Sequence, residues 1–178
     1  AGTDSGTFDY FTEAINGKED ACRGDFTSSE DDNVLVQGVS SDENALGFFG
    51  LAYYEENKGR LKALAVDDEN PANGAGAQIP TAQNVISGSY QPLSRPLFIY
   101  VRKDSLQRPE IKAFVKFYLD NAKSLVSEVG YVPLPDKVYT LAMQRFEKGL
   151  TGSIFSSGGS QVGVTLEELL SAEASKQG

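Results

Sequence analysis

The sequence predicts an α/β protein, because segments with helical periodicity alternate with short apolar runs of the kind that form buried strands. Of the 178 residues, 40% are hydrophobic, and ten Phe and eight Tyr are among them, which is typical of a globular chain with a packed core. This length is enough for one large domain or two smaller lobes. No apolar run approaches the roughly 18 residues of a membrane span, and the polar, glycine-rich start carries no signal-peptide pattern.

The first helix is expected over residues 6–16. Apolar side chains at positions 8, 11 and 15 recur at spacings of three and four, as on one face of a helix. Asp4 and Ser5 are favourable N-cap residues, and Asn16-Gly17 is a typical helix end.

Further helices follow from caps, acidic first turns and apolar spacing. An acidic turn after Ser28 predicts a helix to about Ser41 with Val34, Leu35 and Val39 facing inward. Pro109 opens a long helix with a wide apolar stripe. This stripe consists of Phe114, Val115, Phe117, Tyr118 and Leu119. The other expected helical ranges are 51–57, 80–86, 122–129, 136–146 with Asp136 as its cap, and 165–170 near the end of the chain.

Three short apolar runs predict the strands of the fold. They cover residues 45–50, 61–66 and 95–102, and the last has the strongest strand pattern of the chain. Residues 67–76 form a loop rich in turn residues, and 131–135 are expected to be extended. The Gly/Ser-rich stretch 151–163 is expected to be mobile.

Composition excludes several kinds of function. The net charge of −9, the pI near 4.5 and the absence of basic clusters argue against nucleic-acid binding. The chain has no histidine, which removes histidine-based catalysis and ordinary zinc sites. The single Cys22 cannot form an internal disulfide, and we interpret it as a small inert thiol. The residues suggest no metal site, cofactor or catalytic centre, so binding rather than an enzymatic reaction is expected.

The loop before the first helix has the chemistry of a small oxyanion site. A helix N-terminus presents backbone N–H groups and partial positive charge, and the hydroxyls of Ser5 and Thr7 would add donors beside Gly6. A simple helix cap explains the same residues. Asp4 to Thr7 also match the aspartic-protease motif, but the residues before them are not an apolar strand.

Several segments together resemble the phosphate-binding proteins of bacterial ABC phosphate transporters, and cyanobacterial-type members most of all. They are GTDSGTFDYFTE (2–13), RGDFTSSEDDNVLVQGV (23–39), LGFFGLAYYEEN (46–57), YQPLSRPLFIYV (90–101) and GYVPLP (130–135). The resemblance implies a type II periplasmic-binding-protein architecture with two α/β lobes and phosphate between them. Such proteins are about twice as long, so the chain corresponds to the later half, without the upstream half.

This resemblance implies a division of the chain into three parts. Residues 1–90 would form second-lobe structure with the anion-binding loop. Residues 91–164 would return through a crossover into the first lobe, and 165–178 would form a C-terminal tail helix. Hinge closure of the two lobes on phosphate would present the receptor to a membrane permease on the periplasmic or extracytoplasmic side. A half-fold would also expose an apolar face that favours self-association.

The family's ligand motif falls on Ser5, Gly6 and Thr7, with Asp4 beside it. Many members place an arginine four residues before that serine, where this chain has Ala1. Arg23 is a candidate replacement, because a guanidinium can contact phosphate with two donors, although a solvated surface arginine explains it equally well. Two other functions remain open at this point: a receptor for another oxyanion such as sulfate or molybdate, and an interaction module that has lost its ligand.

Overall fold

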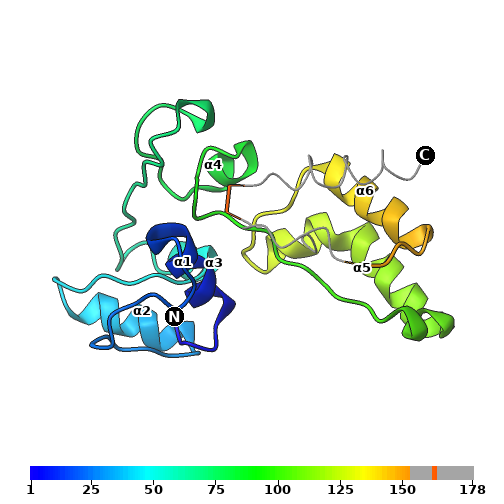
Figure 1. Ribbon diagram of the computed structural model, residues 1–178, viewed down its shortest axis with the longest axis horizontal. Helices are drawn as coiled ribbons and strands as arrows, with labels where there is room; N and C mark the ends of the chain where they lie inside the picture. Colours follow the sequence, from blue (N-terminus) through cyan, green and yellow to red (C-terminus); the bar gives the residue numbers. More distant parts are fainter. Residues whose placement is uncertain (153–161, 164–178) are drawn as a thin grey trace. The chain divides into compact units, whose positions relative to one another are not determined.

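The computed structural model describes residues 1–152 and 162–163. The chain divides into two compact units, residues 1–94 and residues 95 onward, which are described separately below (Figure 1). The predicted tail helix at 165–178 lies outside the described residues, and so does most of the Gly/Ser-rich stretch.

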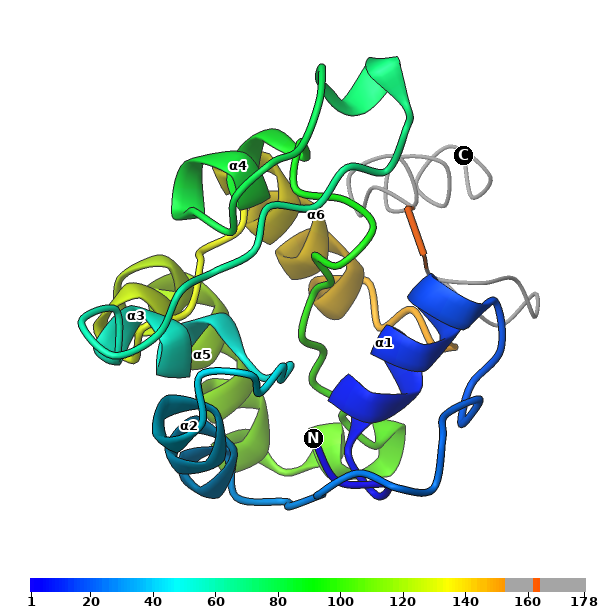
Figure 2. The ribbon, with the colours of Figure 1, turned by 90° about the vertical axis from the view of Figure 1, so that its left-hand side faces the viewer.

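Unit 1 contains four α-helices and one 3-10 helix among its described residues. They are α1 (Gly6–Asn16), α2 (Asp32–Ser41), α3 (Leu51–Glu56), η1 (Pro71–Asn73) and α4 (Ala82–Ser87). Figure 2 shows α2 and α3 side by side, with α1 across the unit from them. The expected first helix is confirmed at both ends, because Ser5 is its N-cap and Gly17 closes it with a left-handed backbone at φ 73°.

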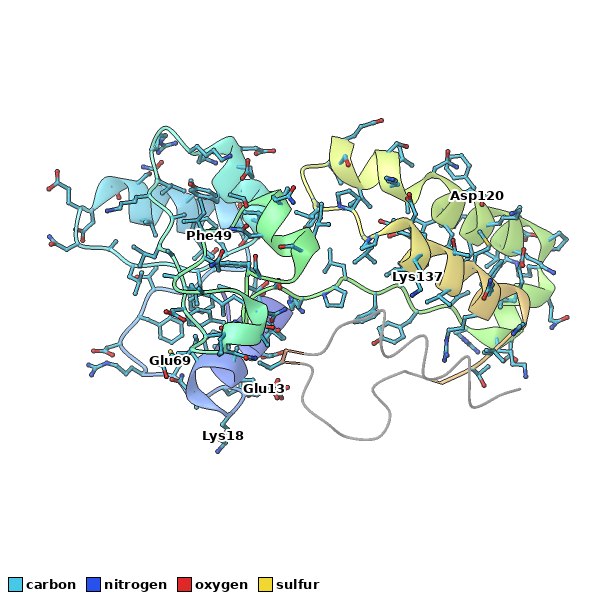
Figure 3. The ribbon with its side chains drawn as sticks, turned by 90° about the horizontal axis from the view of Figure 1, so that it is seen from above. Glu13, Lys18, Phe49, Glu69, Asp120 and Lys137 are labelled. Carbon is cyan, nitrogen blue, oxygen red and sulfur yellow. The ribbon has the colours of Figure 1, made fainter. Side chains whose placement is uncertain are left out.

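The core of unit 1 is a small aromatic and aliphatic cluster. Phe8 of α1 and Leu35 of α2 are buried, and Phe48 and Phe49 pack against them; Figure 3 shows Phe49 within this unit. The rings of Phe11 and Phe48 stack with centroids 3.9 Å apart. This cluster holds α1 against the segment before α3, so the loop at the start of α1 has a packed base.

The last residues of unit 1 are linked to α1 by hydrogen bonds from the hydroxyl of Tyr10. The hydroxyl of Tyr10 lies 2.7 Å from the carbonyl oxygen of Pro92 and 3.1 Å from that of Ser94, and it donates to both. Tyr10 itself is buried, so these bonds form where water competes little.

Unit 2 contains η2 (Lys103–Gln107), α5 (Pro109–Glu128) and α6 (Asp136–Glu147) among its described residues. Val115 and Ala122 of α5 and Val138 of α6 are buried. Lys123 of α5 also donates to the carboxylate of Asp136 at 2.7 Å, and Figure 3 shows the two helices with Asp120 and Lys137 labelled.

The three predicted strands are wrong for the described structure. Residues 45–50 and 95–102 carry neither helix nor strand, and 61–66 make a single antiparallel bridge between Val66 and Gln78. The physical reason is that a strand exists only through backbone hydrogen bonds to a neighbouring strand. An apolar extended run becomes a strand only where another segment meets its N–H and C=O groups, and among the described residues no ladder forms on these runs beyond that one bridge.

Smaller corrections concern helix faces and boundaries. Val34 is half exposed, and Val36 takes the inward position beside Leu35. The two expected helices after Pro109 are one continuous helix, α5. Asp136 is the first helical residue of α6 and not its cap, because Pro135 holds that position. The expected helices at 51–57 and 80–86 form as α3 and α4.

Candidate functional site

The candidate site is the loop that leads into α1. Ser5 has the extended backbone of an N-cap (φ −93°, ψ 127°), and its Oγ accepts the N–H of Thr7 at 3.2 Å. Its carbonyl oxygen accepts the N–H groups of Phe8 and Asp9 at 2.8 and 3.2 Å. The cap that the sequence predicts is therefore formed, and it fixes the direction in which the first turn presents its donors.

One donor of this turn stays open. Gly6 is the first helical residue and is exposed, and its N–H meets no acceptor within the described residues. Ser5 and Thr7 on either side are half-buried, so their hydroxyls stand at the edge of the unit. An exposed backbone donor between two hydroxyl side chains at the positive end of a helix is a suitable place for an anion.

A carboxylate reaches the same loop from far along the sequence. Oε1 of Glu30 accepts the N–H of Asp4 at 3.2 Å. A Cβ on Gly2 would fall 1.8 Å from that oxygen, so a larger residue there would displace the Glu30 side chain. Sequence reasoning missed this contact. The only available signal was Gly2 itself, and a glycine does not say what approaches it.

Arg23 is held by a neighbour in the described structure. Its Nε donates to Oδ1 of Asp25 at 2.7 Å, and its Nη2 donates to the other carboxylate oxygen. This pair raises the pKa of Arg23 and lowers the pKa of Asp25. The Arg23 side chain is 84% exposed. Among the described residues, its hydrogen bonds go to Asp25 and not to the loop at Ser5.

The position four residues before Ser5 is filled by Ala1, whose amine donates to the carbonyl oxygen of Phe48 at 3.3 Å. Burial lowers the pKa of this amine, and the carboxylates of Asp32 and Glu30 oppose that shift. Burial also raises the pKa of Asp32. The base of the candidate loop therefore lies among acidic side chains.

The described residues also bear on metal binding and on membrane crossing. Among residues 1–152 and 162–163, no group of three His, Cys, Asp or Glu side chains is placed to hold a metal ion. Within the same residues, no helix has the length and apolar character needed to cross a membrane. Cys22 is a free, exposed thiol.

Comparison with known proteins gives a consistent result. A family model described as a PBP superfamily domain matches residues 1–122. Protein SphX of Synechococcus elongatus is 56% identical over 172 residues, which are 97% of this chain and 49% of that protein. The phosphate-binding protein PstS of Staphylococcus haemolyticus is 35% identical over 144 residues, 80% of this chain and 43% of its own.

A solved structure agrees with these sequence matches. It is described as a possible phosphate binding protein from Planctomyces limnophilus, and it matches 83% of this chain and 51% of its own length with a TM-score of 0.61 and 44% identity. The chain thus spans about half the length of the relatives that it matches. The fold is periplasmic-binding-protein-like, as the resemblance implied.

Proposed function

The chain belongs to the PBP superfamily, and on this basis we propose that it binds inorganic phosphate as part of the extracytoplasmic receptor of an ABC phosphate importer. Relatives named as phosphate-binding proteins support the choice of ligand. The observation that carries the proposal within this chain is the open N–H of Gly6 between the hydroxyls of Ser5 and Thr7. The proposed role is binding and delivery to a membrane permease, without an enzymatic reaction.

In this proposal the first turn of α1 binds the phosphate oxygens through hydrogen bonds. Gly6 supplies a backbone donor, Thr7 a hydroxyl, and Ser5 a hydroxyl that also caps the helix. Asp4 lies at the rim, and its N–H is already satisfied by Glu30. Attraction of the anion would come from donors that a rigid helix end holds in place, since the net charge of −9 repels anions at long range.

Arg23 is proposed as the cationic member of the site. Its guanidinium would have to release Asp25 before it could contact phosphate with two donors. An exposed ion pair is worth little, so such an exchange requires only a modest gain. Arg23→Gln should then weaken phosphate binding. Unchanged affinity would remove Arg23 from the site and leave the loop assignment intact.

Calorimetric titration with phosphate at pH 7, with sulfate as the competing anion, tests the proposal. It should be run on this chain alone, and on this chain joined to the upstream half of SphX. We expect Ser5→Ala and Thr7→Val each to weaken phosphate binding by about tenfold or more, the loss of one hydrogen bond to a charged ligand.

The matched control is Thr81→Ala. The Oγ1 of Thr81 caps α4 by accepting the N–H of Asn84 at 3.2 Å, as Ser5 caps α1. Its loss removes a helix cap without touching the loop, so phosphate affinity should stay the same. Phosphate binding that is equally strong in the Ser5 and Thr7 variants would contradict the proposed site, and tighter binding of sulfate would contradict the proposed ligand.

A further inference from the structure

The loop that leads into α1 is held by a side chain from the start of another helix. Glu30 comes directly before the N-cap of α2, and its Oε1 accepts the N–H of Asp4 at 3.2 Å. The next N–H of the loop, that of Ser5, donates to the carbonyl oxygen of Gly2 at 3.0 Å and closes a turn over residues 2–5. Two consecutive N–H groups therefore have fixed acceptors immediately before the exposed N–H of Gly6.

Both ends of the contact between Glu30 and the loop are anchored on the same core. Phe8 in the first turn of α1 and Leu35 of α2 belong to the core cluster of unit 1. The backbone beside Glu30 is fixed as well, because Asp31 caps α2 and its Oδ1 accepts the N–H of Asn33 at 2.9 Å. Since the backbone is already ordered at both ends, the contact costs little more than the side-chain freedom of Glu30.

Gly2 leaves the space that this carboxylate occupies. Gly2 is buried, and a Cβ added to it would lie 1.8 Å from Oε1 and 2.4 Å from Cδ of Glu30. Its backbone φ lies outside the left-handed region, so its conformation does not require glycine. The structural reason for a glycine at this position is therefore the approach of Glu30. An alanine there would expel the end of a flexible side chain and leave the backbone unstrained.

We propose that Glu30 is a positioning residue for the anion site: together with Gly2, it holds the loop in the shape that presents the Gly6 N–H and the Ser5 hydroxyl to phosphate. This inference rests on the proposed function. It predicts an effect whose sign is opposite to that of simple electrostatics. A carboxylate near a bound anion repels it, so loss of the charge alone would tighten binding. Loss of the hydrogen bond releases the loop, and the ligand must then order it, which weakens binding.

Calorimetric titration of this chain with phosphate at pH 7 separates the two effects. Glu30→Ala removes both the charge and the acceptor, and it should weaken phosphate binding about tenfold, the loss of one hydrogen bond to a charged group. Glu30→Gln removes the charge but keeps an oxygen that accepts the Asp4 N–H, so phosphate should bind at least as tightly as to the unsubstituted chain. Gly2→Ala should weaken binding by the same factor as Glu30→Ala. The double variant should lose no more than either single variant, because both substitutions remove one contact.

Two substitutions serve as matched controls. Glu43→Ala removes the same charge from an exposed position just after α2, away from the loop. Gly59→Ala adds a Cβ that meets open space, at a backbone φ outside the left-handed region. Neither control should weaken phosphate binding.

Amide hydrogen exchange followed by NMR reports on the loop without phosphate. The Asp4 N–H should exchange about fivefold faster or more in Glu30→Ala and in Gly2→Ala, and it should stay protected in Glu30→Gln. Unchanged exchange at Asp4 in the first two variants would overturn the proposal, whether or not phosphate binds. Tighter phosphate binding by Glu30→Ala would also overturn it, as would additive losses in the double variant. An unsubstituted chain that binds no phosphate would contradict the proposed function, and exchange at Asp4 would then decide alone whether Glu30 holds the loop.

Discussion

At the scale of single residues, Thr12 shows how unit 1 closes the turn after α1. It is fully buried, its Oγ1 donates to the carbonyl oxygens of Phe8 and Asp9, and the same oxygen accepts the N–H of Asp20 at 2.9 Å. Asp20 has a left-handed backbone at φ 62°. The Thr12 hydroxyl therefore stabilises a turn in which the left-handed backbone of Asp20 is unfavourable.

Replacing this hydroxyl gives the first prediction. Thr12→Val keeps the shape of the side chain and removes the acceptor of the Asp20 N–H, so we expect the free energy of unfolding to fall by about 1–2 kcal/mol. Amide exchange at Asp20 should become about tenfold faster. Thr12→Ser keeps the oxygen and serves as the control, and it should keep Asp20 protected. Faster exchange in Thr12→Ser but not in Thr12→Val would mean that the methyl group, and not the hydroxyl, holds the turn.

Tyr90 gives a prediction about pH. Burial raises the pKa of its phenol above the ordinary value near 10. The folded chain then holds the proton at a pH where the unfolded chain has lost it, so this contribution to stability is complete below pH 10 and is lost as pH rises above it. Urea unfolding at pH 9 and pH 11 should show a smaller loss of stability for Tyr90→Phe than for the unsubstituted chain. An equal loss in the two proteins would exclude Tyr90 as a source of alkaline sensitivity.

At the scale of elements, the ends of helices were predictable because their signals are local. Ser5 and Gly17 bracket α1 as capping chemistry requires, and Pro109 opens α5. Residues 95–102 were predicted as a strand from equally strong local signals, but a strand needs hydrogen-bonding partners that no local pattern can guarantee. The same limit applies at the candidate site. The cap at Ser5 followed from sequence, whereas Glu30 reaches Asp4 across 26 positions, which no spacing rule predicts.

Substitution of two glycines by alanine should change stability in opposite directions, which tests how far backbone conformation controls these helices. Gly17 ends α1 at φ 73°, where an added side chain is strained, so Gly17→Ala should destabilise unit 1 by about 1 kcal/mol. Gly38 lies within α2, and a Cβ there would meet only open space. Gly38→Ala should therefore stabilise α2 by about 0.5–1 kcal/mol, because alanine loses less backbone freedom on folding. Chemical denaturation measures both changes, and the same sign for both would show that backbone conformation does not control these sites.

At the scale of the whole molecule, the net charge of the chain has the same sign as the charge of the proposed ligand. The chain has 25 acidic and 16 basic residues, yet the proposed ligand is an anion. Local donors at a helix end act within a few ångströms, whereas net charge acts over the Debye length, which is about 30 Å at 10 mM salt and about 8 Å at 150 mM. Attraction at the site and repulsion around it therefore respond differently to salt.

This difference predicts an unusual salt dependence for phosphate binding. In a receptor that attracts its ligand through positive net charge, added salt slows association. Here salt screens the long-range repulsion first, so we expect the association rate of phosphate to rise about twofold between 10 and 150 mM sodium chloride. Stopped-flow measurement on this chain can follow that rate, with a neutral osmolyte as the control for viscosity. A rate that falls with salt would mean that a cation such as Arg23 dominates the approach, and Arg23→Gln should then abolish the fall.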